Sequence, residues 1–303
     1  MRVGVLGCGN VGSALVQLLA DEGQAIAERT GVSLEVTRVA VRSTARERNV
    51  ALPDGCLTSD AEAVATDPDV DVVVEVIGGI EPARSLILDA LKSGKPVVTA
   101  NKELLANVGA ELVDAAAAAG VDLLYEASVG GGIPLIRPLR ESLAGERINR
   151  VMGIVNGTTN YILTRMSEGG ASYSDALAEA QTLGYAERDP TADVEGFDAA
   201  AKCAILAGIA FGVKVVAGDV YREGISGLTS ADIAYADRLG YVIKLLAIAE
   251  QAEGEVAVRV HPAMIPKTHP LAAVRESFNA VFIEGEAVGE LMLYGRGAGG
   301  MPT

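Results

Sequence analysis

The feature that most constrains the fold is a glycine-rich segment near the N-terminus. Gly7-Cys8-Gly9-Asn10-Val11-Gly12 reads GxGxxG, follows the apolar run Val3–Leu6 and opens a segment with helical spacing, Val11–Ala27. In that setting the first glycine permits a tight turn, the second lets the backbone approach a pyrophosphate, and the third packs the helix against the strand. The N–H groups at the start of the helix favour an anion. We therefore expect a dinucleotide to bind at Gly7, Gly9, Asn10, Val11 and Gly12.

The first half of the chain alternates strand-like and helical patterns. Val70–Ile77 is almost entirely β-branched, as in a strand buried on both faces of a parallel sheet. After Gly132 a run of helices and a separate set of strands replace this rhythm. We therefore predict an α/β fold, with a doubly wound parallel sheet of Rossmann type over 1–132 and an α+β domain over 133–303. In the first domain we expect strands at 34–41, 70–77, 96–99 and 123–126 and helices at 82–93 and 103–119; in the second, helices at 133–143, 159–168, 174–183, 197–211 and 232–251 and strands at 150–155, 256–260, 280–284 and 290–293.

The charge balance bears on partners and location. Asp and Glu number 40 against 25 Lys and Arg, a net charge of −15 that repels nucleic-acid phosphates and anionic lipids. We therefore expect a small-molecule substrate, and neither nucleic acid nor a membrane. No apolar run reaches about 18 residues and no signal-peptide pattern is present. Cys8, Cys56 and Cys203 are too widely spaced for a disulfide framework or a zinc site, so we expect the reducing cytoplasm.

The end of the second predicted strand bears on which dinucleotide binds. NAD-specific sites usually place Asp or Glu there to accept from the ribose 2′-OH, and positions 41–46 contain no acid. Arg42 can instead pair with a 2′-phosphate, helped by Ser43, Thr44 or Arg46. This favours NADP, although NAD remains possible if Arg42 is a solvated surface charge.

A polar cluster, Thr99-Ala100-Asn101-Lys102, follows the fourth predicted strand. Ligands of open α/β sheets bind beyond the carboxyl ends of the strands. We therefore expect Thr99 and Lys102 to contact the cofactor, and Lys102 also the substrate. Alternatively, Asn101 only caps the following helix.

A second polar cluster, residues 184–202, precedes and enters a strongly apolar helix. Asp198 and Lys202 are four residues apart and share a face of that helix. In one interpretation the two residues form an ion pair on the surface. In the other, Lys202 lies at the rim of the core, where a lysine can transfer protons. Spacing alone does not separate these readings.

Seven segments together resemble one known family. They are GCGNVG (7–12), EVIGG (75–79), TANKELLA (99–106), YEASVGGGIP (125–134), GIVNGTTNYIL (153–163), LGYAERDPTADVEGFDAAAK (183–202) and LYGRGAGGMPT (293–303). Their order and length identify the chain as similar to homoserine dehydrogenases along nearly its whole length.

The resemblance implies an oxidoreductase. The reaction is the reversible, NAD(P)-dependent interconversion of L-homoserine and L-aspartate 4-semialdehyde, the branch step toward threonine, isoleucine and methionine. The family pattern makes Lys202 the proton donor or acceptor. It places Glu187, Asp198 and Lys102 at the substrate, and Gly184 and Gly297 beside the cofactor.

The resemblance also implies a monovalent cation, usually sodium. Oxygen ligands suit such a hard ion, and the family pattern draws them from Glu126, Val129, Gly131 and Ile133. Family members commonly form homodimers through the second domain. The family's closing C-terminal helix and its regulatory ACT domain are expected to be absent after Thr303.

Two other functions compete with this one. Aspartate-semialdehyde dehydrogenase needs a nucleophilic cysteine, and none of the three cysteines has a suitable setting. Cys8 lies in the glycine-rich loop, Cys203 in an apolar helix, and Cys56 in a loop without a nearby histidine. The other alternative is a non-catalytic or truncated NAD(P)-binding module of the same fold.

Overall fold

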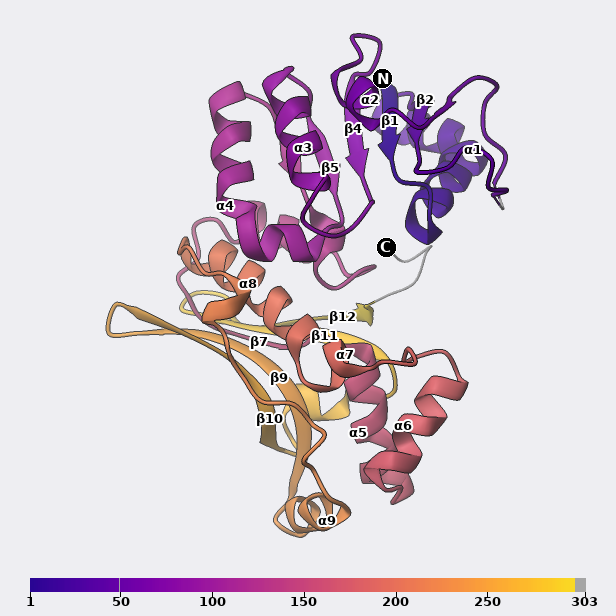
Figure 1. The fold of residues 1–303 in the computed structure, drawn as a ribbon. Coiled ribbons are helices and arrows are strands. Elements are labelled where there is room, and N and C mark those ends of the chain that lie inside the picture. Colours follow the sequence, from indigo (N-terminus) through magenta and orange to yellow (C-terminus); the bar gives the residue numbers. More distant parts are fainter. Residues whose placement is uncertain (49, 298–303) are drawn as a thin grey trace. The chain divides into compact units, whose positions relative to one another are not determined.

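The computed structural model describes residues 1–48 and 50–297. These residues form two compact units that divide between Ser128 and Val129, a few residues before the boundary expected after Gly132. Each unit contains one sheet and its own helices (Figure 1). Within the described residues, no helix is both long and apolar enough to cross a bilayer.

The first unit is built on a six-stranded sheet in the order β3-β2-β1-β4-β5-β6. All neighbouring strands run parallel, so their carboxyl ends share one edge. The order reverses between β1 and β4, which is the doubly wound arrangement, and the predicted Rossmann fold is confirmed. The strands are β1 (Arg2–Leu6), β2 (Glu35–Ala40), β3 (Leu57–Thr58), β4 (Val72–Glu75), β5 (Val97–Thr99) and β6 (Leu123–Leu124).

The helices of the first unit begin and end at recognisable signals. Asp60 and Asn101 accept from backbone N–H groups as N-caps, and Gly31 and Gly120 end two helices in the left-handed conformation. Strand β3 and helix α2 were not predicted from the sequence, because neither is long enough to show a period. The helices are α1 (Asn10–Thr30), α2 (Ala61–Thr66), α3 (Ala83–Lys92), α4 (Lys102–Ala119) and the 3₁₀ turn η1 (Glu126–Ser128).

The second unit has a six-stranded sheet in the order β12-β11-β7-β9-β10-β8. Its neighbours are antiparallel except β10 and β8, which are parallel. Together with the helices this confirms the predicted α+β character. The strands are β7 (Ile148–Ile154), β8 (Tyr221–Arg222), β9 (Tyr241–Ala252), β10 (Glu255–Pro266), β11 (Phe278–Gly285) and β12 (Gly289–Arg296).

The helices of the second unit agree with the sequence over α8 but differ at the start of the unit. In place of the helix expected at 133–143, the structure has the shorter π-helical segment η2 (Pro138–Ser142). The remaining elements are α5 (Gly157–Gly169), α6 (Tyr173–Thr182), α7 (Thr191–Val194), α8 (Phe197–Phe211), α9 (Ser230–Arg238) and the 3₁₀ turns η3 (Ala217–Asp219) and η4 (Pro270–Ala273).

The helix expected over 232–251 is wrong in its second half. Helix α9 ends at Arg238, Gly240 has a φ of 82°, and the chain continues as the long strand β9. Strand β9 pairs with both β7 and β10, so it is central and its residues from Ile243 to Ala249 are buried. A continuous apolar run suits a central strand as well as a buried helix, and the glycine decides between them.

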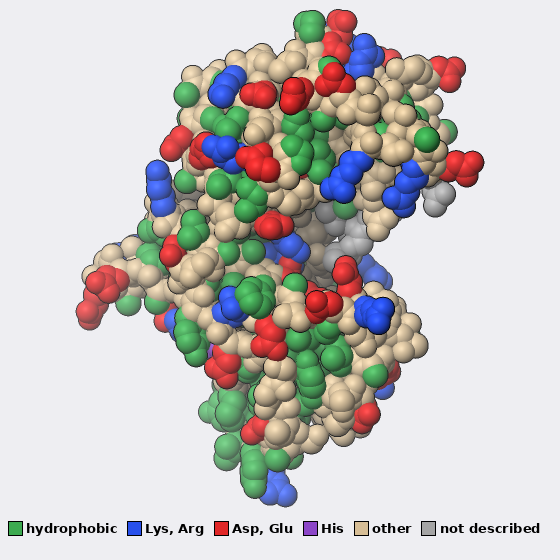
Figure 2. All heavy atoms as spheres, in the orientation of Figure 1, with side chains coloured by type: hydrophobic (Ala, Val, Ile, Leu, Met, Phe, Trp, Pro, Cys, Tyr) green, Lys and Arg blue, Asp and Glu red, His purple; other side chains and the backbone are tan. Residues whose placement is uncertain are grey.

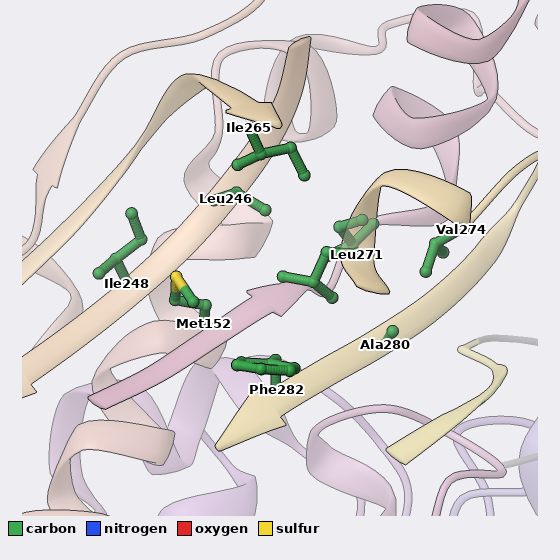
Figure 3. Close-up of a cluster of buried hydrophobic side chains, with 9 residues drawn as sticks. Met152, Leu246, Ile248, Ile265, Leu271, Val274, Ala280 and Phe282 are labelled. Carbon is green, nitrogen blue, oxygen red and sulfur yellow. The ribbon is translucent and has the colours of Figure 1, made fainter. Parts of the chain in front are cut away.

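One face of the second sheet carries a buried hydrophobic cluster (Figure 3). Met152 on β7, Ile248 on β9 and Phe282 on β11 are paired across the strands, so their side chains share this face. The turn η4 covers the face with Leu271. The other members are Ile154, Leu246, Ile265, Val274 and Ala280.

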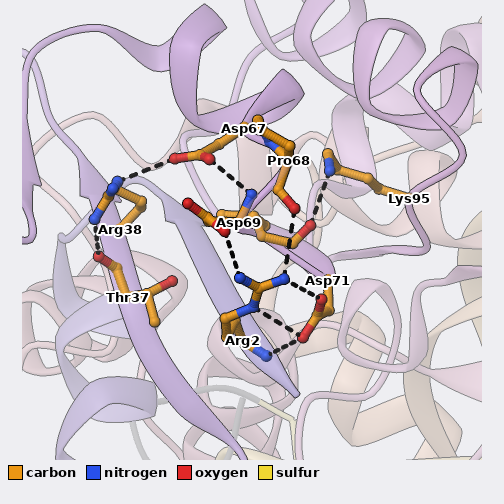
Figure 4. Close-up of polar contacts among 9 residues, drawn as sticks. Arg2, Thr37, Arg38, Asp67, Pro68, Asp69, Asp71 and Lys95 are labelled. Carbon is orange, nitrogen blue, oxygen red and sulfur yellow. Dashed lines mark hydrogen bonds and ion pairs between the residues drawn. The ribbon is translucent and has the colours of Figure 1, made fainter.

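The amino edge of the first sheet is held by charged side chains (Figure 4). Arg2, at the start of β1, pairs with Asp69 at 2.6 Å and Asp71 at 3.0 Å. The hydrogen bonds from Arg2 lower the pKa of the Asp71 carboxyl to about 2. Lys95 donates to the carbonyl of Val70 at 2.8 Å. These contacts join β1 and β4 at the edge opposite to their carboxyl ends.

Candidate functional site

The glycine-rich loop has the geometry that its spacing predicts. Gly7 has a φ of 103°, and a Cβ there would lie 2.8 Å from the carbonyl oxygen of Val76. A Cβ on Gly12 would collide with the carbonyl oxygen of Gly7. Gly7 is therefore required by its φ and by the nearby carbonyl of Val76. Gly12 is required because α1 packs directly against the loop that follows β1.

The start of α1 fits an anionic group. Gly9 is the N-cap, and within the described residues no side chain caps it and no acid lies in the first turn. A Cβ on Gly9 would meet nothing within 4 Å, so the backbone faces open space. Backbone N–H groups and the helix dipole attract negative charge at such an end. The residues present therefore fit a pyrophosphate.

The loop after β2 places Arg42 in solvent, directly past the carboxyl end of that strand. Arg48, which the sequence reading did not single out, folds this loop. Its guanidinium donates to the carbonyls of Ser43 at 2.7 Å and Arg46 at 2.6 Å. An arginine closing a loop on backbone carbonyls leaves no periodic signal in a sequence.

A buried carboxylate organises the carboxyl ends of β4 and β5. Glu75 is fully buried, and its carboxylate accepts from Thr99 Oγ1 at 2.6 Å and from the N–H of Ile77 at 2.7 Å. Thr99 Oγ1 in turn accepts from the N–H of Asn101 at 3.0 Å. The hydroxyl of Thr99 therefore has a structural partner within the unit.

Lys102 is the first residue of α4 and is exposed. Asn101 caps that helix, accepting from Leu104 N at 3.1 Å, and its Nδ2 donates to the carbonyl of Gly79 at 2.7 Å. Asn101 therefore caps the helix, as the alternative expects, whereas the contacts of Thr99 and Lys102 with a cofactor stay a prediction. The same contacts fix the backbone that carries Lys102. One signal could have revealed Glu75: an acid at the end of an otherwise β-branched strand.

Helix α8 in the second unit carries a buried ion pair. Lys202 Nζ lies 2.7 Å from Asp198 Oδ2, and both residues are 8% exposed. Lys202 also donates to the backbone carbonyl of Val155 at 2.6 Å. The surface-pair alternative is therefore wrong, because Lys202 lies within the packed part of the helix and reaches the end of β7.

Two further polar side chains join this pair, and the sequence reading assigned a role to neither. Asn156 Nδ2 donates to Asp198 Oδ2 at 3.0 Å and to Asp193 Oδ1 at 2.7 Å. The side-chain carbonyl of Asn156 accepts from the N–H of Thr159 at 2.9 Å and caps α5. Asn156 is 42 residues from Asp198 along the chain, so spacing could not reveal this contact.

Glu187 lies in the exposed loop between α6 and α7. Gln181 Nε2 donates to the backbone carbonyl of Glu187 at 3.0 Å, and Thr158 Oγ1 donates to that of Tyr185 at 2.7 Å. The rings of Tyr161 and Tyr185 are 4.9 Å apart. Helix α5 therefore holds both the loop of Glu187 and, through Asn156, the pair on α8.

The two glycines expected at the cofactor both lie in the second unit. Gly184 follows α6 with a φ of 77° and open space beside its Cα. A Cβ on Gly297 would collide with the side-chain amide of Asn279, which is 1% exposed. Gly297 is therefore required for packing against β11. Of the predicted nucleotide residues, the others belong to the first unit.

The stretch expected to bind a cation crosses the division between the units. Glu126 lies in η1, Val129 and Ile133 are buried, and Gly131 has a φ of 53°. Among residues 1–48 and 50–297, no three His, Cys, Asp or Glu side chains cluster as a metal site. The expected ligands include only one carboxylate, so they do not depend on such a cluster. Carbonyl and carboxylate oxygens are the donors that hard cations take.

Both halves of the chain match models of one enzyme family. Residues 7–126 match the NAD-binding domain of homoserine dehydrogenase, and residues 134–303 match the homoserine dehydrogenase model. The two matches support the catalytic prediction rather than the non-catalytic alternative.

Individual relatives agree. Homoserine dehydrogenase of Corynebacterium glutamicum is 56% identical over 99% of this chain and 68% of its own length. A solved homoserine dehydrogenase from Thiobacillus denitrificans has a TM-score of 0.95 at 48% identity, over 100% of this chain and 70% of its own. A hyperthermophilic archaeal homoserine dehydrogenase, solved in complex with NADPH, has a TM-score of 0.82 at 28% identity, over 100% of this chain and 93% of its own. The chain belongs to the homoserine dehydrogenase family of oxidoreductases.

Proposed function

We propose that this chain interconverts L-homoserine and L-aspartate 4-semialdehyde, with Lys202 as the group that accepts and returns the hydroxyl proton. The observation that carries the proposal is the buried contact of Lys202 with Asp198 and the carbonyl of Val155. When bound, the nicotinamide takes up or gives back the hydride at the alcohol carbon.

The geometry around Lys202 suits proton transfer. Its nitrogen is tetrahedral, and two directions are occupied by fixed acceptors, Asp198 Oδ2 and the carbonyl of Val155. In the neutral amine, the two hydrogens satisfy these acceptors and the lone pair points away from them. In the ammonium form, a third hydrogen takes that place. A substrate oxygen there can lose a proton to Lys202 in oxidation and receive one in reduction.

Charge complementarity supports the proposed substrate contacts. Homoserine is a zwitterion, so carboxylates suit its ammonium group. We assign Glu187 and Asp198 to that role, and Lys102 to the junction of substrate and cofactor. Glu187 is exposed and so is accessible to a ligand, whereas Asp198 serves the ammonium of Lys202 as well.

For the cofactor we propose NADP, bound by Gly7, Gly9, Asn10, Val11, Gly12, Thr99, Lys102, Gly184 and Gly297, with Arg42 at the 2′-phosphate. The exposed position of Arg42 beyond β2 and the lack of an acid at 41–46 support this preference. NAD is the alternative. The archaeal relative with NADPH is a precedent within the family.

We further propose that Glu126, Val129, Gly131 and Ile133 bind a monovalent cation such as sodium. The support is the set of oxygen donors and the family resemblance.

We propose a homodimer formed by the second unit. Hydrophobic side chains gather over the region where Figure 1 places β9, β10 and α9 (Figure 2). Tyr235 and Leu239 are more than half exposed there, and Met264 nearly half. Exposed apolar patches of this kind mark interfaces.

The three free cysteines also fit a reducing compartment such as the cytoplasm.

The deciding experiment is turnover. The purified chain is given aspartate semialdehyde with NADPH and, separately, with NADH, and loss of the reduced dinucleotide is followed by absorbance. Homoserine with the oxidised cofactors tests the reverse direction. Dinucleotide binding without turnover in either direction would overturn the proposed activity.

A further inference from the structure

Asn156 uses its whole side-chain amide to connect three elements at the corner between β7 and α5. It donates to Asp193 on α7 and to Asp198 on α8, and accepts from Thr159 at the start of α5. Its side chain is buried, at 5% exposed. An amide with both hydrogens and its carbonyl engaged has one fixed orientation.

We propose that Asn156 is a positioning residue that sets the geometry and proton affinity of the Lys202–Asp198 pair. The proposal rests on the proposed function of Lys202. Asn156 does not need to touch the substrate, because it acts through the carboxylate of Asp198.

Two negative charges meet at this amide. Asp193 Oδ1 and Asp198 Oδ2 both lie within hydrogen-bond distance of the same nitrogen of Asn156, at 2.7 and 3.0 Å. Neighbouring carboxylates repel one another, and the negative charge of each makes nearby groups bind their protons more tightly. Asn156 donates one hydrogen bond to each carboxylate, and these bonds stabilise both carboxylates in the ionised form.

The same contact determines how strongly Asp198 holds Lys202. Asp198 Oδ2 accepts from both Asn156 and Lys202, so its negative charge is shared between two donors. Without the amide, the Lys202 ammonium takes a larger share of that charge, and the proton is held more tightly. Val155, the residue before Asn156, supplies the second acceptor of Lys202. One short segment therefore sets both contacts of this nitrogen.

The structural role of Asn156 can be separated from the positioning role. Asn, Asp and Ser are equally good N-caps, so Asn156→Asp and Asn156→Ser keep the cap of α5. Neither can donate two hydrogen bonds as the amide does. The Asp variant adds a third carboxylate beside Asp193 and Asp198, whereas the Ser variant adds no charge.

We expect kcat for homoserine oxidation to fall by about tenfold to a hundredfold, as for the loss of one hydrogen bond to a charged group. Oxidation needs the neutral amine, so its pH profile should move to higher pH, further in Asn156→Asp than in Asn156→Ser. Semialdehyde reduction needs the ammonium form and should retain activity to higher pH. KM for NADPH should change little.

A charge-removing variant gives the opposite sign. Asp193→Asn keeps the shape and an acceptor for Asn156 but removes one negative charge, so the oxidation profile should move to lower pH. Ser172→Ala removes the cap of α6 in the same unit. It should lower the thermal midpoint without moving the pH profile.

The outcomes distinguish the two proposals. If Lys202→Ala retains normal turnover, the proposed function fails. If Lys202→Ala is inactive while both Asn156 variants keep the native kcat and pH profile, the positioning role is overturned. If the Asn156 variants do not fold, Asp193→Asn decides: an unmoved profile overturns the role, and a shift to lower pH supports it.

Discussion

Asp198 and Lys202 lie one turn apart on α8, and their charged atoms are 2.7 Å apart inside the second unit. Because the pair is buried, each charge depends on the other and on few further partners. The ionised state of Lys202 is therefore set by residues that can be changed one at a time.

Replacing Lys202 by Ala should lower kcat by about 10²–10⁴-fold, the usual contribution of general acid–base catalysis. NADPH affinity, measured by fluorescence titration, should stay nearly native. Lys214→Ala, at an exposed lysine beyond the end of α8, is the matched control. Near-native turnover of Lys202→Ala would remove this residue from the mechanism.

Replacing Arg42 by Ala should raise KM for NADP by about tenfold or more, because a charge-assisted hydrogen bond to phosphate is lost. KM for NAD should change little, since NAD has no 2′-phosphate. The ratio of the two KM values, from initial rates at one ionic strength, is the measurement. Arg29→Ala, at the exposed end of α1, controls for net charge. Equal shifts for both cofactors would exclude the 2′-phosphate role.

Replacing Glu75 by Ala should destabilise the first unit by roughly 2–4 kcal/mol, because buried donors at Thr99 and Ile77 lose their acceptor. Glu75→Gln keeps an acceptor and should cost less. Urea unfolding gives the free energies, and NADPH titration shows whether the backbone before Lys102 is disturbed. Glu103→Ala, exposed in α4, should have little effect on stability. A native-like Glu75→Ala would show that the carboxylate is not needed.

Lys244 on β9 predicts a pH-dependent stability. Its ammonium position is buried beside Val274 and Asn160 Oδ1, and burial lowers its pKa from 10.5 to about 8. The unfolded chain therefore binds this proton at higher pH than the folded chain does. The free energy of unfolding therefore decreases as pH falls from about 10.5 to about 8, because the unfolded chain takes up the proton first. Below about pH 8 the loss is constant.

The measurement is the unfolding free energy of the native chain relative to Lys244→Met between pH 7 and pH 10. The unfolding free energy of the native chain should increase relative to that of the variant as pH rises above about 8, by at most roughly 3 kcal/mol. Lys267→Met, at an exposed lysine paired with Asp237, is the matched control. A constant difference between native chain and Lys244→Met would contradict the prediction.

A bound monovalent cation should stabilise the chain by mass action. Replacing tetramethylammonium chloride by sodium chloride at constant ionic strength should raise the thermal midpoint of unfolding. The corresponding gain in the free energy of unfolding is up to about 3 kcal/mol at a hundredfold excess of sodium over its Kd. Glu126→Gln should weaken the sodium dependence, and Glu141→Gln, at an exposed glutamate, should not. The same midpoint in both salts would argue against the site.

The sequence predicts the first unit well because each of its signals is local. Glycines at fixed spacing, a strand before them and a helix after them determine the loop that Gly7 and Gly12 form. The ion pair of Asp198 and Lys202 is also local, being one helical turn. Its burial was not predictable, because burial depends on the packing of α8 against β9, β10 and β7.

The features that the sequence reading missed depend on distant parts of the chain. Asn156 meets Asp198 across 42 residues and Glu75 meets Thr99 across 24. No periodic pattern records such contacts. Strand β9 was predicted as a helix because a continuous apolar run suits a buried helix as well as a central strand, and its pairing with β7 and β10 exists only in the folded chain.

Lys202 takes one of its two acceptors from the main chain, at the carbonyl of Val155. Every amino acid has that carbonyl, so the chemistry places no demand on the side chain at this position, and packing alone restricts it. A saturation library should therefore accept other buried aliphatic residues of similar volume at 155 with activity retained. At 156 the same library should select for the amide itself.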